Sequence, residues 1–213
     1  MNTVKAINGV KATSKTSYLV KIAMLSAIAG VLMLLEVPMP FLAPNFYKMD
    51  LSEVPVLIGA FALGPVAGII IEAVKVLLNL VINGTLTAGV GEFANFLIGI
   101  LLVVPASAIY SRHKTKGTAV IGMVTGIFTM TLGAVLLNAY LLLPVYAKAF
   151  HLPVEAFINM GHAINPAIDN MFTFCALAVL PFNLIKGIVI MVIVLAIYKR
   201  IHHLLNRGFG SGK

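Results

Sequence analysis

One long apolar stretch, residues 51–82, limits the folds that this chain can adopt. As a single helix it would be about 48 Å long, whereas the hydrocarbon core of a bilayer is about 30 Å thick. The pair Gly64-Pro65 lies near its middle. Because glycine favours a helix C-terminus and proline blocks an internal helix hydrogen bond, this pair predicts a turn. The stretch is therefore either one strongly tilted span or two short spans joined at Gly64-Pro65.

The composition excludes an ordinary soluble domain. Hydrophobic residues make up 60% of the 213 residues and charged residues only 10%, against about a quarter in soluble domains. Continuous apolar runs of about 20 residues predict a polytopic helical membrane protein, and their lack of alternation argues against a β-barrel. A secretory signal peptide is the rival interpretation of the N-terminal region. However, the apolar run from Tyr18 to Leu35 is long for a signal peptide.

The distribution of basic residues decides the number of spans. The net charge is +8, and most Lys and Arg residues flank apolar spans, so we interpret them as topology determinants and lipid contacts rather than a nucleic-acid surface. They cluster in the N-terminal segment, at residues 112–116 and near the C-terminus. Positive residues in short loops stay in the cytoplasm. A hairpin at 51–82 places all three clusters inside, whereas a single span would place the last two outside.

The sequence therefore predicts an all-α integral protein of the cell membrane with six spans and with both termini in the cytoplasm. Residues 1–17 would form an N-terminal segment, residues 18–200 the membrane domain and residues 201–213 a tail. Proline-rich residues 37–50 and the stretch 147–169 would connect spans on the outer side. The six predicted spans are about 18–36, 51–63, 65–82, 89–111, 118–146 and 170–198.

Several polar residues fall at a similar depth, in the outer half of the predicted bundle. They are Tyr47, Glu92, Asn95, Asn138, Asn183 and Lys186. The pairs Glu92/Asn95 and Asn183/Lys186 have an i, i+3 spacing, which puts each pair on one helix face. A lysine at mid-membrane costs about 2.5–3.5 kcal/mol and normally has a partner or a purpose. Although any single Asn could simply bond a neighbouring helix, the set suits a neutral, partly flat organic ligand better than a metal ion.

The chain carries no visible catalytic or energy-coupling motif. The patterns GxxxxGK[ST], HExxH and GxSxG do not occur, and we expect neither an enzyme nor a metal or cofactor site. Glu72 and Lys75 are expected to pair with each other or with another span. An ion-coupled secondary transporter that uses Glu72/Lys75 or Glu92 stays open as an alternative function. The small-residue pairs Gly64/Gly68 and Gly122/Gly126 predict close helix packing.

Three motifs carry a resemblance to a known family. They are KMD at 48–50 with the SEVPVLIGAFALGPVAG that follows, GVGEFANF at 89–96, and PFNLIKG at 181–187. Through these motifs, residues 18–200 resemble the riboflavin-specific S components of energy-coupling factor (ECF) transporters. The resemblance implies a six-helix S-component bundle whose riboflavin site lies near the outer face, closed by the loop after the first helix. It also implies partners, namely a transmembrane coupling (T) subunit and two ATPases that hydrolyse the ATP.

The resemblance implies roles for individual residues as well. Asn138, Asn183 and Lys186 match polar contacts to the isoalloxazine ring, and Tyr47 and Met49 fall in the gating loop. Ala23 and Ala27 match a small-residue face that docks on the coupling subunit. An S component for another vitamin, such as thiamine or pantothenate, is the nearest alternative. The predicted substrate-binding residues are Tyr47, Met49, Glu92, Asn95, Asn138, Asn183 and Lys186.

Overall fold

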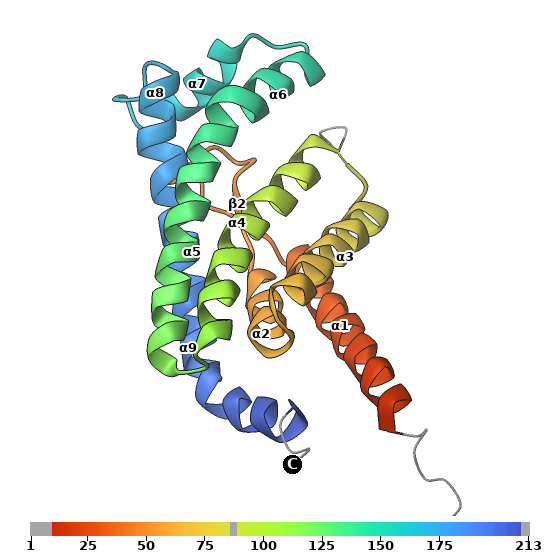
Figure 1. Ribbon diagram of the computed structural model, residues 1–213. Coiled ribbons are helices and arrows are strands. Elements are labelled where there is room, and N and C mark those ends of the chain that lie inside the picture. Colours follow the sequence, from red (N-terminus) through yellow and green to blue (C-terminus); the bar gives the residue numbers. More distant parts are fainter. Residues whose placement is uncertain (1–9, 86–88, 210–213) are drawn as a thin grey trace, which may run out of the picture.

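The computed structural model describes residues 10–85 and 89–209, with side chains at 15–85 and 89–198. The ends of the predicted terminal segments, residues 1–9 and 210–213, lie outside the described residues. The described chain forms a bundle of helices with a two-stranded antiparallel sheet in the loop after the first helix (Figure 1). The elements are α1 Val10–Leu34, β1 Val37–Pro38, β2 Lys48–Met49, α2 Glu53–Leu63, α3 Pro65–Asn83, α4 Val90–Arg112, α5 Lys116–Leu137, η1 Asn138–Leu142, α6 Leu143–Ala149, α7 Val154–His162, α8 Met171–Phe174, η2 Cys175–Val179 and α9 Leu180–Phe209.

The long apolar stretch folds as two helices, which confirms the predicted turn. Gly64 separates α2 from α3 with φ 99°, a conformation that side chains disfavour, and Pro65 opens α3, where its missing N–H has no helical partner to lose. The Gly64 N–H donates to the carbonyl of Ala60 at 2.9 Å. Nothing lies within 4 Å of where a Cβ on Gly64 would sit. This glycine therefore serves the turn, and not the close packing that its pairing with Gly68 predicted.

Within residues 10–85 and 89–209, five helical segments are long and apolar enough to cross a membrane. The additional helix α2 has 11 residues, or about 16 Å, and is too short to cross the hydrocarbon core alone. Two of the five segments are composite, because a π-helical segment, η1 or η2, interrupts the α-helix. The five are Lys15–Leu34, Pro65–Asn83, Val90–Arg112, Lys116–Ala149 and Met171–Tyr198.

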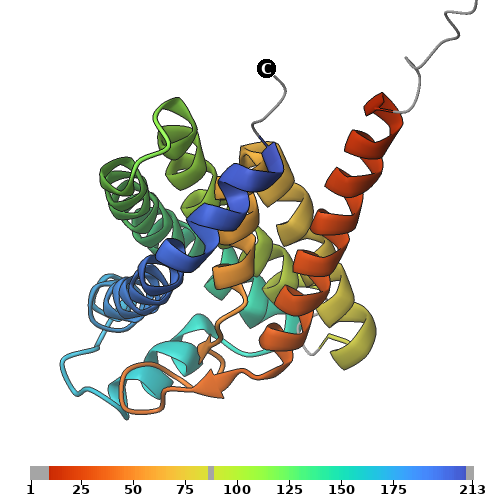
Figure 2. The same ribbon diagram turned by 90° about the horizontal axis from the view of Figure 1, so that it is seen from below.

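The elements sort to two ends of the bundle. In Figure 1 the start of α1, the α2–α3 turn, the α4–α5 connection and the end of α9 all lie at the lower end. Helices α6, α7 and α8 lie at the opposite end. Helix α1 stands at the edge of the bundle, where it packs on α2 and α3 (Figure 2). The connection at 112–116 and the last turns of α9 therefore lie on the same side as the start of α1.

Close packing of α4 on α5 depends on glycine, as the sequence predicted. A Cβ at Gly122 would collide with the backbone carbonyl of Ala106, and a Cβ at Gly126 with that of Leu102. Gly68 on α3 is enclosed in the same way by side chains of α2 and α4. The absence of a side chain lets these helix backbones approach one another.

Apolar residues form two buried clusters. The inner cluster joins α1, α2 and α3 to α4, α5 and the later part of α9, and includes Leu57, Val103 and Ile190. The outer cluster joins the loop after β1 to α6, α7, η2 and the start of α9, and includes Phe157 and Phe174. Ile98 packs against both clusters. The candidate site lies where the two clusters meet.

Candidate functional site

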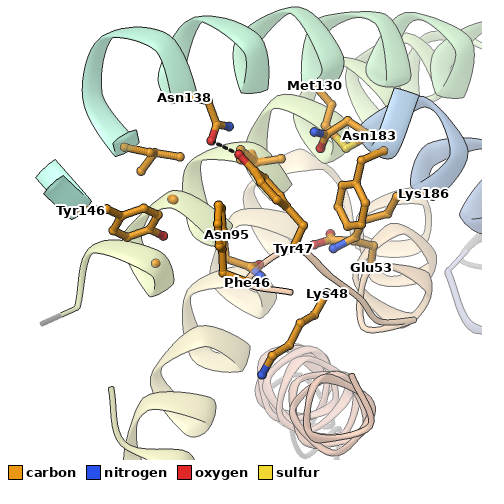
Figure 3. Close-up of a pocket in the computed structure, with 15 residues that line it drawn as sticks. Phe46, Tyr47, Lys48, Glu53, Asn95, Met130, Asn138, Tyr146, Asn183 and Lys186 are labelled. Carbon is orange, nitrogen blue, oxygen red and sulfur yellow. Dashed lines mark hydrogen bonds between the residues drawn. The ribbon is translucent and has the colours of Figure 1, made fainter. Parts of the chain in front are cut away.

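A cavity of about 120 Å³ lies between the loop, α2, α4, α5, η1 and α9 (Figure 3). Phe46, Ile98 and Phe182 supply part of its apolar wall. Five of the seven predicted substrate-binding residues line it. The polar and charged lining residues are Tyr47, Lys48, Glu53, Asn95, Tyr146, Asn138, Asn183 and Lys186.

The small sheet turns the loop back toward the bundle. Proline at three positions between 38 and 44 prevents a regular helix, as the sequence predicted, and the strands pair Val37 with Met49 and Pro38 with Lys48. An ion pair between Lys48 and Glu36 joins the two strands outside the ladder. This pairing places Tyr47, the residue before β2, inside the cavity.

Tyr47 lines the cavity and lies among the other labelled lining residues in Figure 3. Its ring packs against Phe46, Phe174 and Phe182, with centroids 4.7, 6.3 and 5.5 Å away. Its hydroxyl donates to Oδ1 of Asn138 at 2.5 Å (Figure 3). Burial raises the pKa of Tyr47 well above its usual value, so the phenol stays protonated and keeps this donor. The loop therefore occupies a hydrogen-bond acceptor that the sequence assigned to substrate.

Lys186 has a partner from the same loop. Its Nζ lies 2.9 Å from Oδ2 of Asp50, and the side chains are only 10% and 4% exposed. Asp50 also accepts hydrogen bonds from the backbone N–H of Ser52 at 2.8 Å and from its hydroxyl. Burial by itself would raise the pKa of Asp50, but the ammonium groups of Lys186 and Lys75 and the Ser52 hydroxyl hold it below its usual range. The pair ties the loop to α9, 136 residues further along the chain.

Lys75 is the centre of a second buried charge cluster. Its Nζ lies 2.8 Å from Oε1 of Glu53 and 2.6 Å from Oε1 of Glu72, and it donates to Oδ1 of Asn95 at 3.4 Å. The predicted pairing of Glu72 with Lys75 is confirmed, and Glu53 adds a partner from another helix. Glu53 and Asn95 line the cavity, whereas Glu72 does not. Lys75 thus supports one wall of the cavity from behind.

Asn138 and Asn183 form the opposite wall. The Nδ2 of each donates at 2.8 Å to the carbonyl four residues earlier, that of Ala134 and that of Val179. Both lie beside a π-helical segment, since η1 begins at Asn138 and η2 ends four residues before Asn183. Such segments are rare and frequently occur at functional sites. One N–H of each amide is bound within its own helix, which fixes the side chain and leaves the second N–H for another partner.

The other predicted residues lie away from the cavity. Met49 belongs to β2 and does not line it. Glu92, in the first turn of α4, accepts a hydrogen bond from the Thr85 hydroxyl at 3.1 Å and does not line it either. Ala23 and Ala27 lie on the exposed face of α1. The roles assigned to these four residues stay predictions.

Sequence reasoning missed Glu53, Lys48, Phe46, Phe182 and Tyr146 in the lining. The available signal was weak. Glu53 follows Asp50 by three residues at the start of an apolar helix, a position where acidic residues are also common for purely helical reasons. Aromatic residues at the ends of spans are expected at membrane interfaces in any case. Among the described side chains, no group of three or more His, Cys, Asp or Glu residues could hold a metal ion.

Comparisons with known proteins show a family and several similar proteins. Residues 17–198 match the family described as "ECF transporter, substrate-specific component". The riboflavin transporter RibU of Staphylococcus aureus (strain TCH60) is 38% identical over 189 residues, which cover 89% of this chain and 92% of that protein. The riboflavin transporter FmnP of Bacillus subtilis (strain 168) is 39% identical over 181 residues, or 84% of this chain and 88% of that protein.

A solved structure of the S component of a bacterial ECF transporter has a similar fold. It superposes with a TM-score of 0.72 at 35% sequence identity, and the alignment covers 91% of this chain and 99% of the chain in that structure. The chain belongs to the family of substrate-specific components of ECF transporters.

Proposed function

We propose that this multi-pass membrane protein is the riboflavin-binding S component of an ECF transporter in the cell membrane. Similar proteins of S. aureus and B. subtilis are named riboflavin transporters, and the chain covers 92% and 88% of their lengths. The observation that carries the proposal is the cavity itself. Its lining includes Asn138, Asn183 and Lys186 together with Phe46 and Tyr47 of the loop, which supports the proposal.

Riboflavin does not fit the cavity while Tyr47 occupies it. Sites for organic ligands of this size usually enclose about 300–1,000 Å³, and the cavity has about 120 Å³. Withdrawal of the loop would remove the phenol ring, free Oδ1 of Asn138 and enlarge the space between the amide wall and the aromatic residues. The ring would then lie where Tyr47 lies now, with Asn138 and Asn183 at its polar edge.

The assignment of the site is tested by riboflavin affinity. Asn183→Ala removes a buried polar partner, so binding should weaken by about 1–3 kcal/mol, or about 5-fold to 150-fold. Lys186→Ala should weaken it as well. Asn79→Ala is the matched control, because Asn79 is also a buried span asparagine but lies outside the cavity lining. Quenching of riboflavin fluorescence by purified protein measures all three affinities. Wild-type affinity in both cavity variants would remove this assignment, and competition by thiamine or pantothenate would favour another vitamin.

The topology is a proposal of six crossings, in which α2 and α3 form a hairpin and the loop residues before the short α2 complete its crossing. The lower end in Figure 1 would face the cytoplasm, because positive residues gather in the short connection between α4 and α5. Accessibility of cysteines introduced at residues 64, 85 and 114 tests it. Positions 64 and 114 should react from inside and position 85 from outside. Labelling of position 114 from outside would overturn the topology.

The energy for uptake would come from partner chains. We propose a T subunit and two ATPases, with docking through the exposed small residues Ala23 and Ala27 of α1. Ala23→Leu and Ala27→Leu should stop ATP-dependent uptake yet leave riboflavin binding unchanged. Simultaneous loss of binding would show that the pair only packs the bundle. Uptake by this chain alone, driven by an ion gradient, would contradict an ATP-driven importer.

A further inference from the structure

One acceptor in the cavity wall has no protein partner. Glu53 lines the cavity and is only 2% exposed. Its Oε1 is 2.8 Å from Nζ of Lys75, but its Oε2 is buried with no hydrogen-bond donor among the residues that the structure describes. A buried carboxylate oxygen without a donor is costly, about 1–3 kcal/mol or more for a charged group. An oxygen left in this state beside a ligand cavity is therefore suited to a donor that the ligand brings.

The other polar groups around the cavity include both donors and acceptors. One N–H of each amide, that of Asn138 and that of Asn183, donates to a helix carbonyl, which leaves the second N–H of each amide for another partner. Lys48, Asn95, Tyr146 and Lys186 carry further donors, and the ammonium of Lys186 is already 2.9 Å from Asp50. Among these lining groups, Oε2 of Glu53 is the buried acceptor without a donor in the described part of the chain, so a hydroxyl donor of the ligand would complement it.

The charge of the surroundings points the same way. Five buried ionisable side chains lie at or directly behind the cavity, three carboxyl groups and two lysines. Each lysine already has a carboxylate within 3 Å. A neutral hydroxyl can approach Glu53 without adding charge to this set, whereas an anionic group would meet an unpaired carboxylate oxygen. The five are Asp50, Glu53, Glu72, Lys75 and Lys186.

We propose that Oε2 of Glu53 binds a hydroxyl group of the substrate's polyol chain. The inference rests on the proposed function, since riboflavin joins a flat ring to such a ribityl chain. The amide wall formed by Asn138 and Asn183 would hold the ring edge. Glu53, fixed by Lys75, would hold the chain on the opposite side of the cavity. Glu53 is then a residue that selects flavins with a hydroxylated side chain.

Two ligands and two variants test this division. Lumiflavin keeps the ring and its imide but replaces the ribityl chain with a methyl group. Glu53→Gln keeps the size of the side chain, and Lys75 will attract its amide oxygen, so that an NH₂ replaces the acceptor Oε2. Glu72→Gln is the matched control, because it removes the other carboxylate of Lys75 but does not line the cavity. Fluorescence quenching gives the affinity of each purified protein for each flavin.

Glu53→Gln should weaken riboflavin binding about 10-fold or more, since bonds to charged groups contribute about 1.5–3 kcal/mol, and should change lumiflavin binding less than 3-fold. Glu72→Gln should change both by less than 3-fold. Equal losses for the two flavins, equal losses in the two variants, or no loss for riboflavin would each overturn the inference. Should Glu53→Gln not yield a monodisperse protein, Glu53→Asp keeps the charge for Lys75 while withdrawing the oxygen, and the same ligand-selective loss is required.

Failure of the proposed function has a different signature. In that case, wild-type protein that is monodisperse and shows a cooperative thermal transition would bind neither riboflavin nor lumiflavin. A wild-type protein that binds both flavins equally well would leave the proposed function intact and overturn only the role of Glu53.

Discussion

The buried ion pair between Asp50 and Lys186 should be a major contribution to the stability of the ligand-free protein. Removing one partner of such a pair leaves an uncompensated charge and typically costs about 3–5 kcal/mol. The two changes should differ in size here. Asp50→Asn leaves Lys186 alone, whereas Lys186→Met leaves Asp50 with two donors from Ser52 and with the field of Lys75. We expect about 3–5 kcal/mol for Asp50→Asn and about 1–3 kcal/mol for Lys186→Met.

Thermal unfolding in detergent without ligand measures these effects. For a chain of this length, 1 kcal/mol corresponds to about 2–4 °C, so Asp50→Asn should lower Tm by about 6–20 °C. The double variant Asp50→Asn/Lys186→Met completes a mutant cycle. It buries no unpaired charge at this site, so it should be more stable than Asp50→Asn alone by at least about 1 kcal/mol.

The exposed pair in the same loop is the control. Glu36 and Lys48 have side chains that are 30% and 40% exposed, and an exposed pair contributes at most about 1 kcal/mol. Glu36→Gln should therefore lower Tm by no more than about 2–4 °C. A change below about 2 °C for Asp50→Asn, or strict additivity in the double variant, would refute the view that this pair anchors the loop.

Two further variants test the closed loop and the helix packing. Tyr47→Phe removes the hydroxyl that donates to Oδ1 of Asn138. Riboflavin titrations should therefore show binding that is tighter by about 2-fold to 10-fold. Weaker binding would mean that the Tyr47 hydroxyl contacts the ligand instead. Gly122→Ala forces a methyl group against the backbone carbonyl of Ala106 and should lower the free energy of unfolding by about 1–3 kcal/mol, measured as a lower Tm. An unchanged Tm would show that α4 and α5 can move apart without loss of stability.

Features governed by local backbone chemistry were predictable from the sequence. The turn at Gly64-Pro65 follows from what these two residues do to a helix, and the proline-rich loop follows from the same rule. Depth along a helix placed Asn138, Asn183 and Lys186 at one level, and the structure gathers them around one cavity. That estimate works because the rise per residue is nearly constant, whatever the neighbouring helices do.

Features that depend on tertiary contacts were not predictable. Asp50 and Lys186 are 136 residues apart, and the sequence around each of them does not indicate that the two form an ion pair. Glu92 shares a helix face with Asn95, yet it bonds to Thr85 in the preceding connection instead of lining the cavity. An i, i+3 spacing says that two side chains share a side of the helix. It does not say that both reach the same neighbour.

The two π-helical segments carry a consequence for how this family varies. Each widens one turn, as a single inserted residue in an α-helix would, and one residue corresponds to about 100° of rotation about the helix axis. Deleting one residue from η1 would restore a regular α-helix. It would also rotate the whole of α6 about the helix axis, so that α6 would present different side chains to the outer cluster. Relatives that differ in helix length at these two places should therefore differ in the shape of the outer half while sharing the same inner bundle.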